Sequence, residues 1–109
     1  MERIYLDNAA TTPMSIEVAN EIHKANIDLT GNPSSTHSYG RKVKAQIETA
    51  RKSVAEIINA NPSEIIFTSG GTEADNSAIH MSIENLNITR IITSKIEHYA
   101  ILKPLDNLI

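Results

Sequence analysis

Two segments in the first half of the chain place apolar residues three or four positions apart, which is the spacing of one face of a helix. The first begins at Pro13 or Ser15 and ends before the polar loop Gly31–His37. Its apolar positions are Val18, Ile22, Ala25 and Leu29. The second runs from about residue 38 to residue 60, where Asn61-Pro62-Ser63 closes it. Its apolar positions are Val43, Ile47, Ala50, Val54, Ile57 and Ile58. Both segments are predicted to be amphipathic helices.

The pattern changes in the second half of the chain. Residues 65–68 and 90–94 are short apolar runs, which are typical of buried strands, and a helix from about 72 to 85 separates them. A last helix begins at about Tyr99. Strand, helix and strand of this length predict an α/β fold with a parallel sheet. Ligands bind at the carboxyl ends of the strands in such sheets, so the loops 69–72 and 94–98 should share one rim.

Composition narrows the class of protein. The 109 residues are 40% hydrophobic and 21% charged, as expected for one soluble domain. The net charge of −3 gives no electrostatic case for binding nucleic acid or an anionic membrane. The sequence shows no signal peptide and no transmembrane stretch, so we expect a cytoplasmic protein. With no cysteine there is no disulfide and no cysteine metal site, and we expect no metal.

The junction Ser69-Gly70-Gly71-Thr72 is the strongest candidate for chemistry. A predicted strand ends there and a helix begins, so free N–H groups and the positive end of a helix dipole meet. The glycines allow close approach of an anion and a positive φ, and Thr72 can cap the helix and offer its hydroxyl. Neither the P-loop pattern nor the dinucleotide pattern is present. The two readings are a phosphate site of another class and an ordinary tight turn with a helix cap.

Four blocks of sequence together resemble one family. They are Tyr5–Pro13, Gly31–His37, Phe67–Asn76 and Thr93–His98. In this order and spacing they are similar to the amino-terminal part of a cysteine desulfurase, a pyridoxal-phosphate enzyme of the class V aminotransferase group. The pattern is closer to the branch that feeds iron–sulfur cluster assembly than to the selenocysteine lyase-like branch.

The resemblance implies a fold. It is the amino-terminal part of the large domain of fold type I pyridoxal-phosphate transferases, here an incomplete sheet flanked by helices. In that family the two predicted strands are not neighbours, because later strands lie between them. Direct pairing of the two strands is the short-range alternative.

The resemblance also implies roles for individual residues. Gly71 and Thr72 match the position that holds the cofactor phosphate. His98 matches the histidine that stacks on the pyridine ring and assists proton transfer, whereas the residues alone also allow a helix-capping or surface histidine. Lys95 lies near His98 but does not match the cofactor lysine, so it is interpreted as a bystander. Asn32–His37 matches a segment at the mouth of the site.

Other polar residues are interpreted as structural. Glu73 and Asp75 lie in the first turn of the predicted helix, where carboxylates favour the dipole, and Asp75 can reach back as a cap. His23 and His80 lie within predicted helices. For His37 a structural role in the loop is favoured.

The resemblance implies that residues 1–109 are the amino-terminal part of one longer domain. The cofactor lysine, the acid partner of the pyridine nitrogen, the persulfide cysteine and the substrate-binding arginine of the family would all lie beyond Ile109. The whole enzyme would convert L-cysteine to L-alanine and a persulfide, deliver sulfur to an acceptor or iron–sulfur scaffold protein, and form a homodimer. The alternatives are another class V enzyme, such as a selenocysteine lyase or an aminotransferase, and a non-catalytic domain that binds a phosphate or a partner.

Overall fold

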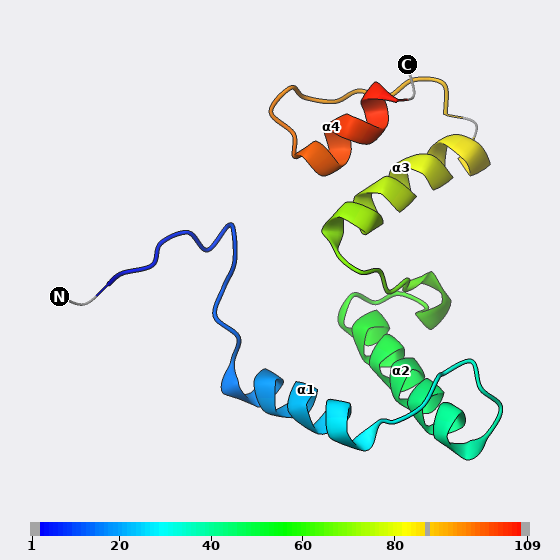
Figure 1. The fold of residues 1–109 in the computed structure, drawn as a ribbon. Coiled ribbons are helices and arrows are strands. Elements are labelled where there is room, and N and C mark those ends of the chain that lie inside the picture. Colours follow the sequence, from blue (N-terminus) through cyan, green and yellow to red (C-terminus); the bar gives the residue numbers. More distant parts are fainter. Residues whose placement is uncertain (1–2, 87, 108–109) are drawn as a thin grey trace. The chain divides into compact units, whose positions relative to one another are not determined.

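The computed structural model describes residues 3–86 and 88–107 as a set of helices and loops (Figure 1). In chain order the helices are α1 (Ile16–Asp28), α2 (Ser38–Ile57), the 3₁₀ helix η1 (Pro62–Glu64), α3 (Gly71–Leu86) and α4 (Tyr99–Asp106). The chain divides into two compact units, residues 1–65 and residues 66–109. The first unit holds α1, α2 and η1, and the second holds α3 and α4.

The helix α1 begins where one of the two predicted starts placed it. The Ser15 hydroxyl oxygen accepts a hydrogen bond from the Val18 N–H at 3.3 Å, which makes Ser15 the N-cap. At the other end, the Lys42 ammonium group of α2 donates to the Asp28 carbonyl oxygen at 3.1 Å. No described residue of α1 is buried, so its apolar stripe has no covering layer within this unit.

The helix α2 ends three residues before the predicted boundary, because its last turn closes on a left-handed residue. Asn59 has a φ of +53°, a conformation that asparagine adopts more readily than most residues. The Ala60 N–H donates to the Ala55 carbonyl at 2.9 Å, and the Asn59 N–H donates to the Glu56 carbonyl at 3.2 Å. These two bonds satisfy carbonyl groups that the end of a helix otherwise leaves open.

The polar loop before α2 packs tightly on the first turn of that helix. Gly40 is buried, and a Cβ atom at its position would lie 2.4 Å from the Ser35 carbonyl oxygen and 2.5 Å from that of Asn32. Gly31 has a φ of +156°, and its own Cβ position is 2.8 Å from the backbone of Tyr39. Both glycines are therefore required by the close approach of two backbone segments.

The short helix η1 is held by a reciprocal cap. The Asn61 side-chain oxygen accepts from the Ser63 N–H at 3.1 Å, and the Glu64 carboxylate accepts from the Asn61 N–H at 2.7 Å. The Arg51 guanidinium of α2 donates to the Ile65 carbonyl and forms an ion pair with Glu48 at 3.3 Å. These contacts fix the segment after η1 against α2.

In the second unit, α4 packs on α3 through its buried face. The buried residues of α4 are Ala100, Pro104 and Leu105. Pro104 and Leu105 lie four and five positions after Ala100, which places all three on the side of α4 that covers α3. This contact makes up most of the described apolar core of the molecule, since Ala55 is the other buried apolar residue.

The two predicted strands are not formed. Neither residues 65–68 nor residues 90–94 are paired in a ladder, and none of the residues that the structure describes is in a strand. A strand exists only when a neighbour satisfies its backbone groups, and these two segments do not pair with each other. The direct pairing that the sequence left open is therefore wrong for this chain.

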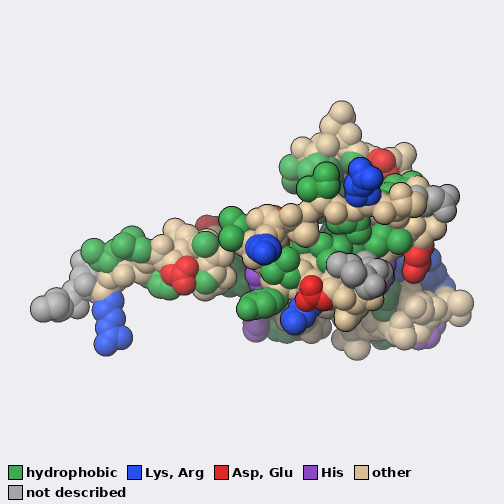
Figure 2. Space-filling view, turned by 90° about the horizontal axis from the view of Figure 1, so that it is seen from above, with side chains coloured by type: hydrophobic (Ala, Val, Ile, Leu, Met, Phe, Trp, Pro, Cys, Tyr) green, Lys and Arg blue, Asp and Glu red, His purple; other side chains and the backbone are tan. Residues whose placement is uncertain are grey.

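Many large apolar side chains remain on the surface (Figure 2). Ile92 and Ile96 are 92% and 94% exposed, and Ile66 is 67% exposed. Within the described ranges, no helix is long and apolar enough to cross a membrane.

Candidate functional site

The start of α3 presents free backbone donors and open space. The first helical hydrogen bond runs from the Ala74 N–H to the Gly70 carbonyl at 3.1 Å, so the N–H groups of residues 71–73 precede the helical ladder. A Cβ atom built at Gly70 or at Gly71 would meet nothing within 4 Å. Among the described glycines a positive φ occurs at Gly31, so the predicted backbone freedom is not used at this junction. The glycine pair instead leaves the donors uncovered.

Glu73 holds the turn that leads into α3. Its carboxylate accepts hydrogen bonds from the Ser69 hydroxyl at 2.6 Å and from the Ser69 N–H at 2.7 Å. These two bonds, the hydroxyl first, lower the pKa of the Glu73 carboxyl below its ordinary value. The structural interpretation of Glu73 is confirmed, but the carboxylate that reaches back is that of Glu73, where the sequence suggested Asp75. Because the Ser69 N–H and hydroxyl are engaged in this way, the donors open to an anion are the N–H groups of residues 71–73.

Thr72 lies inside the first turn of α3 and not at its cap. Because the helix begins at Gly71, the predicted capping role for Thr72 is wrong. Its side chain is exposed beside the free N–H groups. Its carbonyl oxygen accepts from the Asn76 side-chain amide at 2.7 Å. The hydroxyl thus remains available to the same anion as the backbone donors.

His98 is the N-cap of α4. Its Nδ1 accepts a hydrogen bond from the Ala100 N–H at 3.1 Å, with His98 in an extended backbone conformation. A neutral imidazole that accepts at Nδ1 carries its proton on Nε2. The ring is exposed, so Nε2 and the ring faces are open to a ligand. The helix-capping interpretation is therefore correct, and it leaves the Nε2–H free as a hydrogen-bond donor.

Asn76 joins the starts of α3 and α4. Its side-chain amide donates to the Thr72 carbonyl at 2.7 Å and to the Ala100 carbonyl at 3.4 Å. Ala100 also supplies the N–H that holds His98. The structure thus brings Thr72 and His98 together through one half-buried amide. Sequence reasoning gave Asn76 no role, although its place at the end of the block Phe67–Asn76 was a signal that could have prompted the question.

The remaining candidates stay outside this site. His37 caps α2 by accepting from the Gly40 N–H at 3.4 Å, which agrees with the structural role favoured for it, and it belongs to the first unit with the rest of Asn32–His37. Lys95 lies in an exposed turn, and His23 and His80 are exposed on helices. Within residues 3–86 and 88–107, no cluster of histidine or acidic side chains could hold a metal ion.

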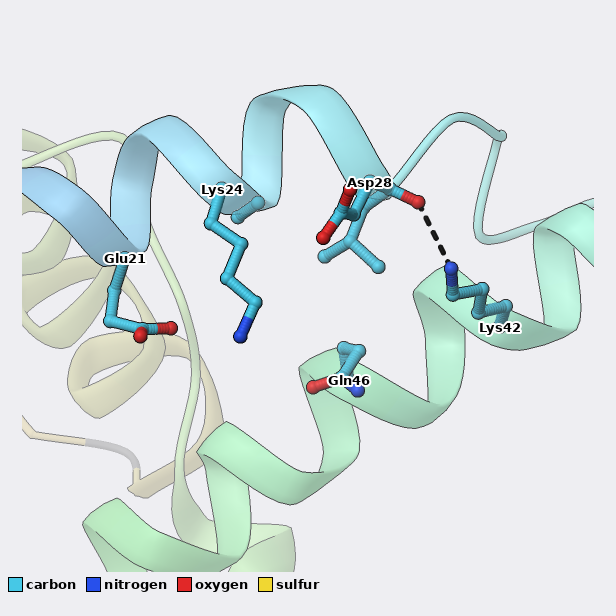
Figure 3. A pocket seen from close by; sticks show the side chains of 7 residues that line it. Glu21, Lys24, Asp28, Lys42 and Gln46 are labelled. Carbon is cyan, nitrogen blue, oxygen red and sulfur yellow. Dashed lines mark hydrogen bonds between the residues drawn. The ribbon is translucent and has the colours of Figure 1, made fainter.

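A pocket between α1 and α2 is lined by charges of both signs (Figure 3). Glu21, Lys24 and Asp28 come from α1, and Lys42 and Gln46 come from α2. The Lys42 ammonium is engaged by the Asp28 carbonyl. Because this pocket presents both acidic and basic side chains, it does not select an anion, and the start of α3 is the better site for a phosphate.

Comparison with known proteins decides the family. The model of the family "Aminotransferase class-V" matches residues 4–109. The chain belongs to this family. The class V chain is 48% identical over 103 residues to the cysteine desulfurase IscS of Dictyoglomus turgidum, covering 93% of this chain and 26% of the relative. It is 42% identical over 120 residues to the selenocysteine lyase of Xenopus tropicalis, covering 97% of this chain and 28% of the relative.

The structure of the class V chain is similar to that of a NifS-like protein. The two share 37% sequence identity with a TM-score of 0.87, and the match covers 98% of this chain and 30% of the other. The chain therefore spans less than a third of the length of the relatives that it matches.

Class V enzymes in general use pyridoxal 5′-phosphate, and the start of α3 fits the phosphate of that cofactor. The fit rests on the N–H groups before the helical ladder, the exposed Thr72 hydroxyl, and the space that a Cβ at Gly71 would fill. A dianionic phosphate is also favoured by the positive end of the α3 dipole. The residues predicted for the cofactor thus have the chemistry that the group requires.

Proposed function

We propose that the 109 residues are the amino-terminal part of a cysteine desulfurase, which converts L-cysteine to L-alanine and an enzyme-bound persulfide. The observation that carries the proposal is the uncovered start of α3, where N–H groups, Thr72 and the open space at Gly71 fit a phosphate. The similarity to the Dictyoglomus turgidum cysteine desulfurase supports it.

In this proposal, Gly71 and Thr72 bind the cofactor phosphate, and His98 stacks on the pyridine ring. When bound, pyridoxal phosphate supplies an electron sink for the bonds of the substrate amino acid. His98 presents a proton on Nε2, because its Nδ1 is engaged by the Ala100 N–H. While it caps α4, His98 can donate a hydrogen bond from Nε2 to a ligand. It can give up that proton only when Nδ1 takes up a proton in place of its bond to the Ala100 N–H.

The proposal has consequences for the rest of the protein. It requires a lysine and a cysteine outside these 109 residues, and the sequence given contains no cysteine. Residues 65–68 and 90–94 would become strands of the family's sheet once the intervening strands are present. The full enzyme would be a cytoplasmic homodimer that passes sulfur to an acceptor or an iron–sulfur scaffold protein.

A selenocysteine lyase is the second candidate, favoured by the relative from Xenopus tropicalis. The residues that would choose between the two substrates are not among those of the start of α3, because a phosphate site serves both reactions.

The test uses the full-length product of the gene, purified with pyridoxal phosphate. A cysteine desulfurase is expected to retain the cofactor and to form alanine and protein-bound sulfur from L-cysteine in equal amounts. Activity with L-selenocysteine alone would replace the proposal by the lyase. A product that neither retains the cofactor nor acts on either amino acid would overturn both the desulfurase and the lyase proposals. The alternative of a non-catalytic domain would then remain.

A further inference from the structure

We propose that Asn76 is a positioning residue that sets His98 against the cofactor-binding start of α3, an inference that rests on the proposed function. The two residues predicted for the site, Thr72 and His98, lie on different helices of the second unit. Their chemistry needs a fixed separation, because a misplacement of about 1 Å can cost roughly 100-fold in rate.

The first step of the argument is the pair of bonds that Asn76 donates. One N–H of its amide group binds the Thr72 carbonyl at 2.7 Å, which lies in the turn that carries the phosphate donors. The same nitrogen binds the Ala100 carbonyl at 3.4 Å. A planar amide that uses its nitrogen for two carbonyl groups fixes the distance between them.

The second step is the reason why the Ala100 carbonyl needs a donor from outside α4. In a helix this carbonyl would accept from the N–H four residues later, and that residue is Pro104. Proline has no N–H, so the regular hydrogen bond cannot form. Ala100 is 5% exposed, which also limits access by water. The Asn76 amide supplies the missing donor, so Asn76 and Pro104 act as a pair.

The third step connects Ala100 to the ring of His98. Ala100 is held on both sides of its backbone, with its carbonyl bound by Asn76 and its N–H bound to Nδ1 of His98. A shift of Ala100 therefore moves the bond that fixes the ring and keeps the proton on Nε2. Through this chain of bonds, the helix that binds the phosphate also orients the imidazole.

The experiment substitutes Asn76→Asp in the full-length product of the gene. Aspartate has the same size, but its carboxylate has no donor and faces two carbonyl oxygens. The matched control is Asp75→Asn, the reverse exchange at the neighbouring residue. The double variant D75N/N76D keeps the net charge and the composition of the wild-type protein, so a change that it shares with Asn76→Asp cannot come from charge.

The first readout needs no cofactor. In the cofactor-free protein, hydrogen exchange of the peptide that contains Ala100 is expected to rise about fivefold or more in Asn76→Asp, because α4 loses its tie to α3. The D75N/N76D variant should behave alike, and Asp75→Asn should match wild type. Equal exchange in all four proteins would overturn the proposal.

The second readout separates positioning from general stability. In the loaded enzyme, kcat for L-cysteine is expected to fall roughly 10- to 100-fold with KM within about twofold, and the visible circular dichroism of the cofactor should change. In a His98→Ala background the same substitution should have no further effect on kcat, because the group through which it acts is gone. An equal loss in both backgrounds would assign Asn76 a merely structural role. If Asn76→Asp does not fold, Asn76→Ser carries the same comparison.

The two proposals fail in different ways. A wild-type protein that holds no cofactor refutes the proposed function, whatever Asn76 does. An active wild-type enzyme whose Asn76→Asp variant keeps its kcat and its hydrogen exchange refutes the role of Asn76 alone.

Discussion

At the scale of one residue, the sequence left two roles open for His98, and the structure shows how they relate. A histidine after an apolar run could be a helix cap or a ligand of the cofactor, and the two roles looked like alternatives. The structure shows the cap, made by Nδ1 in the plane of the ring. Stacking uses the faces of the ring and a hydrogen bond to a ligand uses the Nε2–H, so the cap competes with neither, whereas transfer of the Nε2 proton requires Nδ1 to be protonated in place of the cap. The cap orients the ring for the proposed role.

Thr72 gives the first prediction at this scale. Thr72→Val in the full-length protein should weaken retention of pyridoxal phosphate about 10- to 100-fold, because a hydrogen bond to a charged group contributes about 1.5–3 kcal/mol. Equilibrium dialysis of the cofactor measures the change. Thr49→Val is the control, since that exposed threonine donates to the Ala45 carbonyl on α2 and should leave retention unchanged. Wild-type affinity in Thr72→Val would remove this hydroxyl from the phosphate site.

Glu73 gives a prediction about pH. Its folded-state pKa lies below the ordinary value of 4.5, because Ser69 donates two hydrogen bonds to the charged form. A lowered pKa means that the stabilisation is present above the unfolded pKa and is lost as the pH falls through the folded pKa. Thermal unfolding of wild type and Glu73→Gln should therefore differ at pH 6, and the difference should shrink as the pH falls below 4.5 and vanish once it is below the folded pKa.

Ser69→Ala provides the check on that interpretation. It removes the hydroxyl, which is the larger cause of the shift. The difference between Glu73 and its Gln variant should shrink in this background, and a difference that stays constant from neutral to acid pH would contradict the assignment.

At the scale of elements, glycine stands near the start of α2 and near the start of α3 for two different reasons. A methyl group at Gly40 would collide with the carbonyl groups of Ser35 and Asn32, at 2.4 and 2.5 Å, so the fold requires that glycine. A methyl group at Gly71 would meet nothing within 4 Å, so the fold does not require this one.

The prediction that follows compares two variants of the cofactor-free full-length protein. Gly40→Ala should lower the stability by about 1–3 kcal/mol through overpacking, measured by thermal unfolding. Gly71→Ala should leave stability unchanged or raise it by up to about 1 kcal/mol, because alanine is the better helix former. Gly71→Ala should nevertheless lose cofactor affinity. Loss of stability with full affinity would reverse the assignment.

The elements also show how much could be predicted from the sequence. Helical spacing and caps located the helices, because those signals are local. The predicted opening of α1 by Ser15, which is its N-cap, and the predicted start of α4 at Tyr99 are confirmed. The predicted end of α2 was wrong because Asn59 adopts a left-handed conformation that ends the helix, and hydrophobic periodicity does not reveal this. The role proposed for Asn76 depends on a contact 24 residues away in sequence, and no local pattern encodes it.

The prediction of two strands was wrong for a different physical reason. Residues 65–68 and 90–94 have the apolar pattern of buried strands, but a pattern gives only the preference for a partner and not the partner itself. Because no partner strand is present among the described residues, apolar side chains such as that of Ile92, which is 92% exposed, remain in contact with water.

The stability of the whole molecule depends on how much of its apolar surface is buried. In the described part of the chain, the buried apolar residues are Ala55, Ala100, Pro104 and Leu105, of which only the leucine is a large aliphatic side chain. Folding a residue costs roughly 1–2 kcal/mol of backbone entropy, and burial of large apolar side chains is the main term that offsets it. Here most of the large apolar side chains, among them Ile4, Leu6, Ile57 and Ile96, remain in contact with water.

We therefore expect the isolated 109-residue chain to have low stability and to associate through its exposed apolar residues. Heating should give a gradual change in far-ultraviolet circular dichroism without a cooperative transition, and sedimentation should detect a mixture of sizes. The control is the same 109 residues within the full-length product of the gene, where covering these side chains should restore a sharp transition. A monodisperse monomer of 109 residues that unfolds cooperatively would contradict this expectation, because the exposed isoleucines would then not need a partner to stabilise the fold.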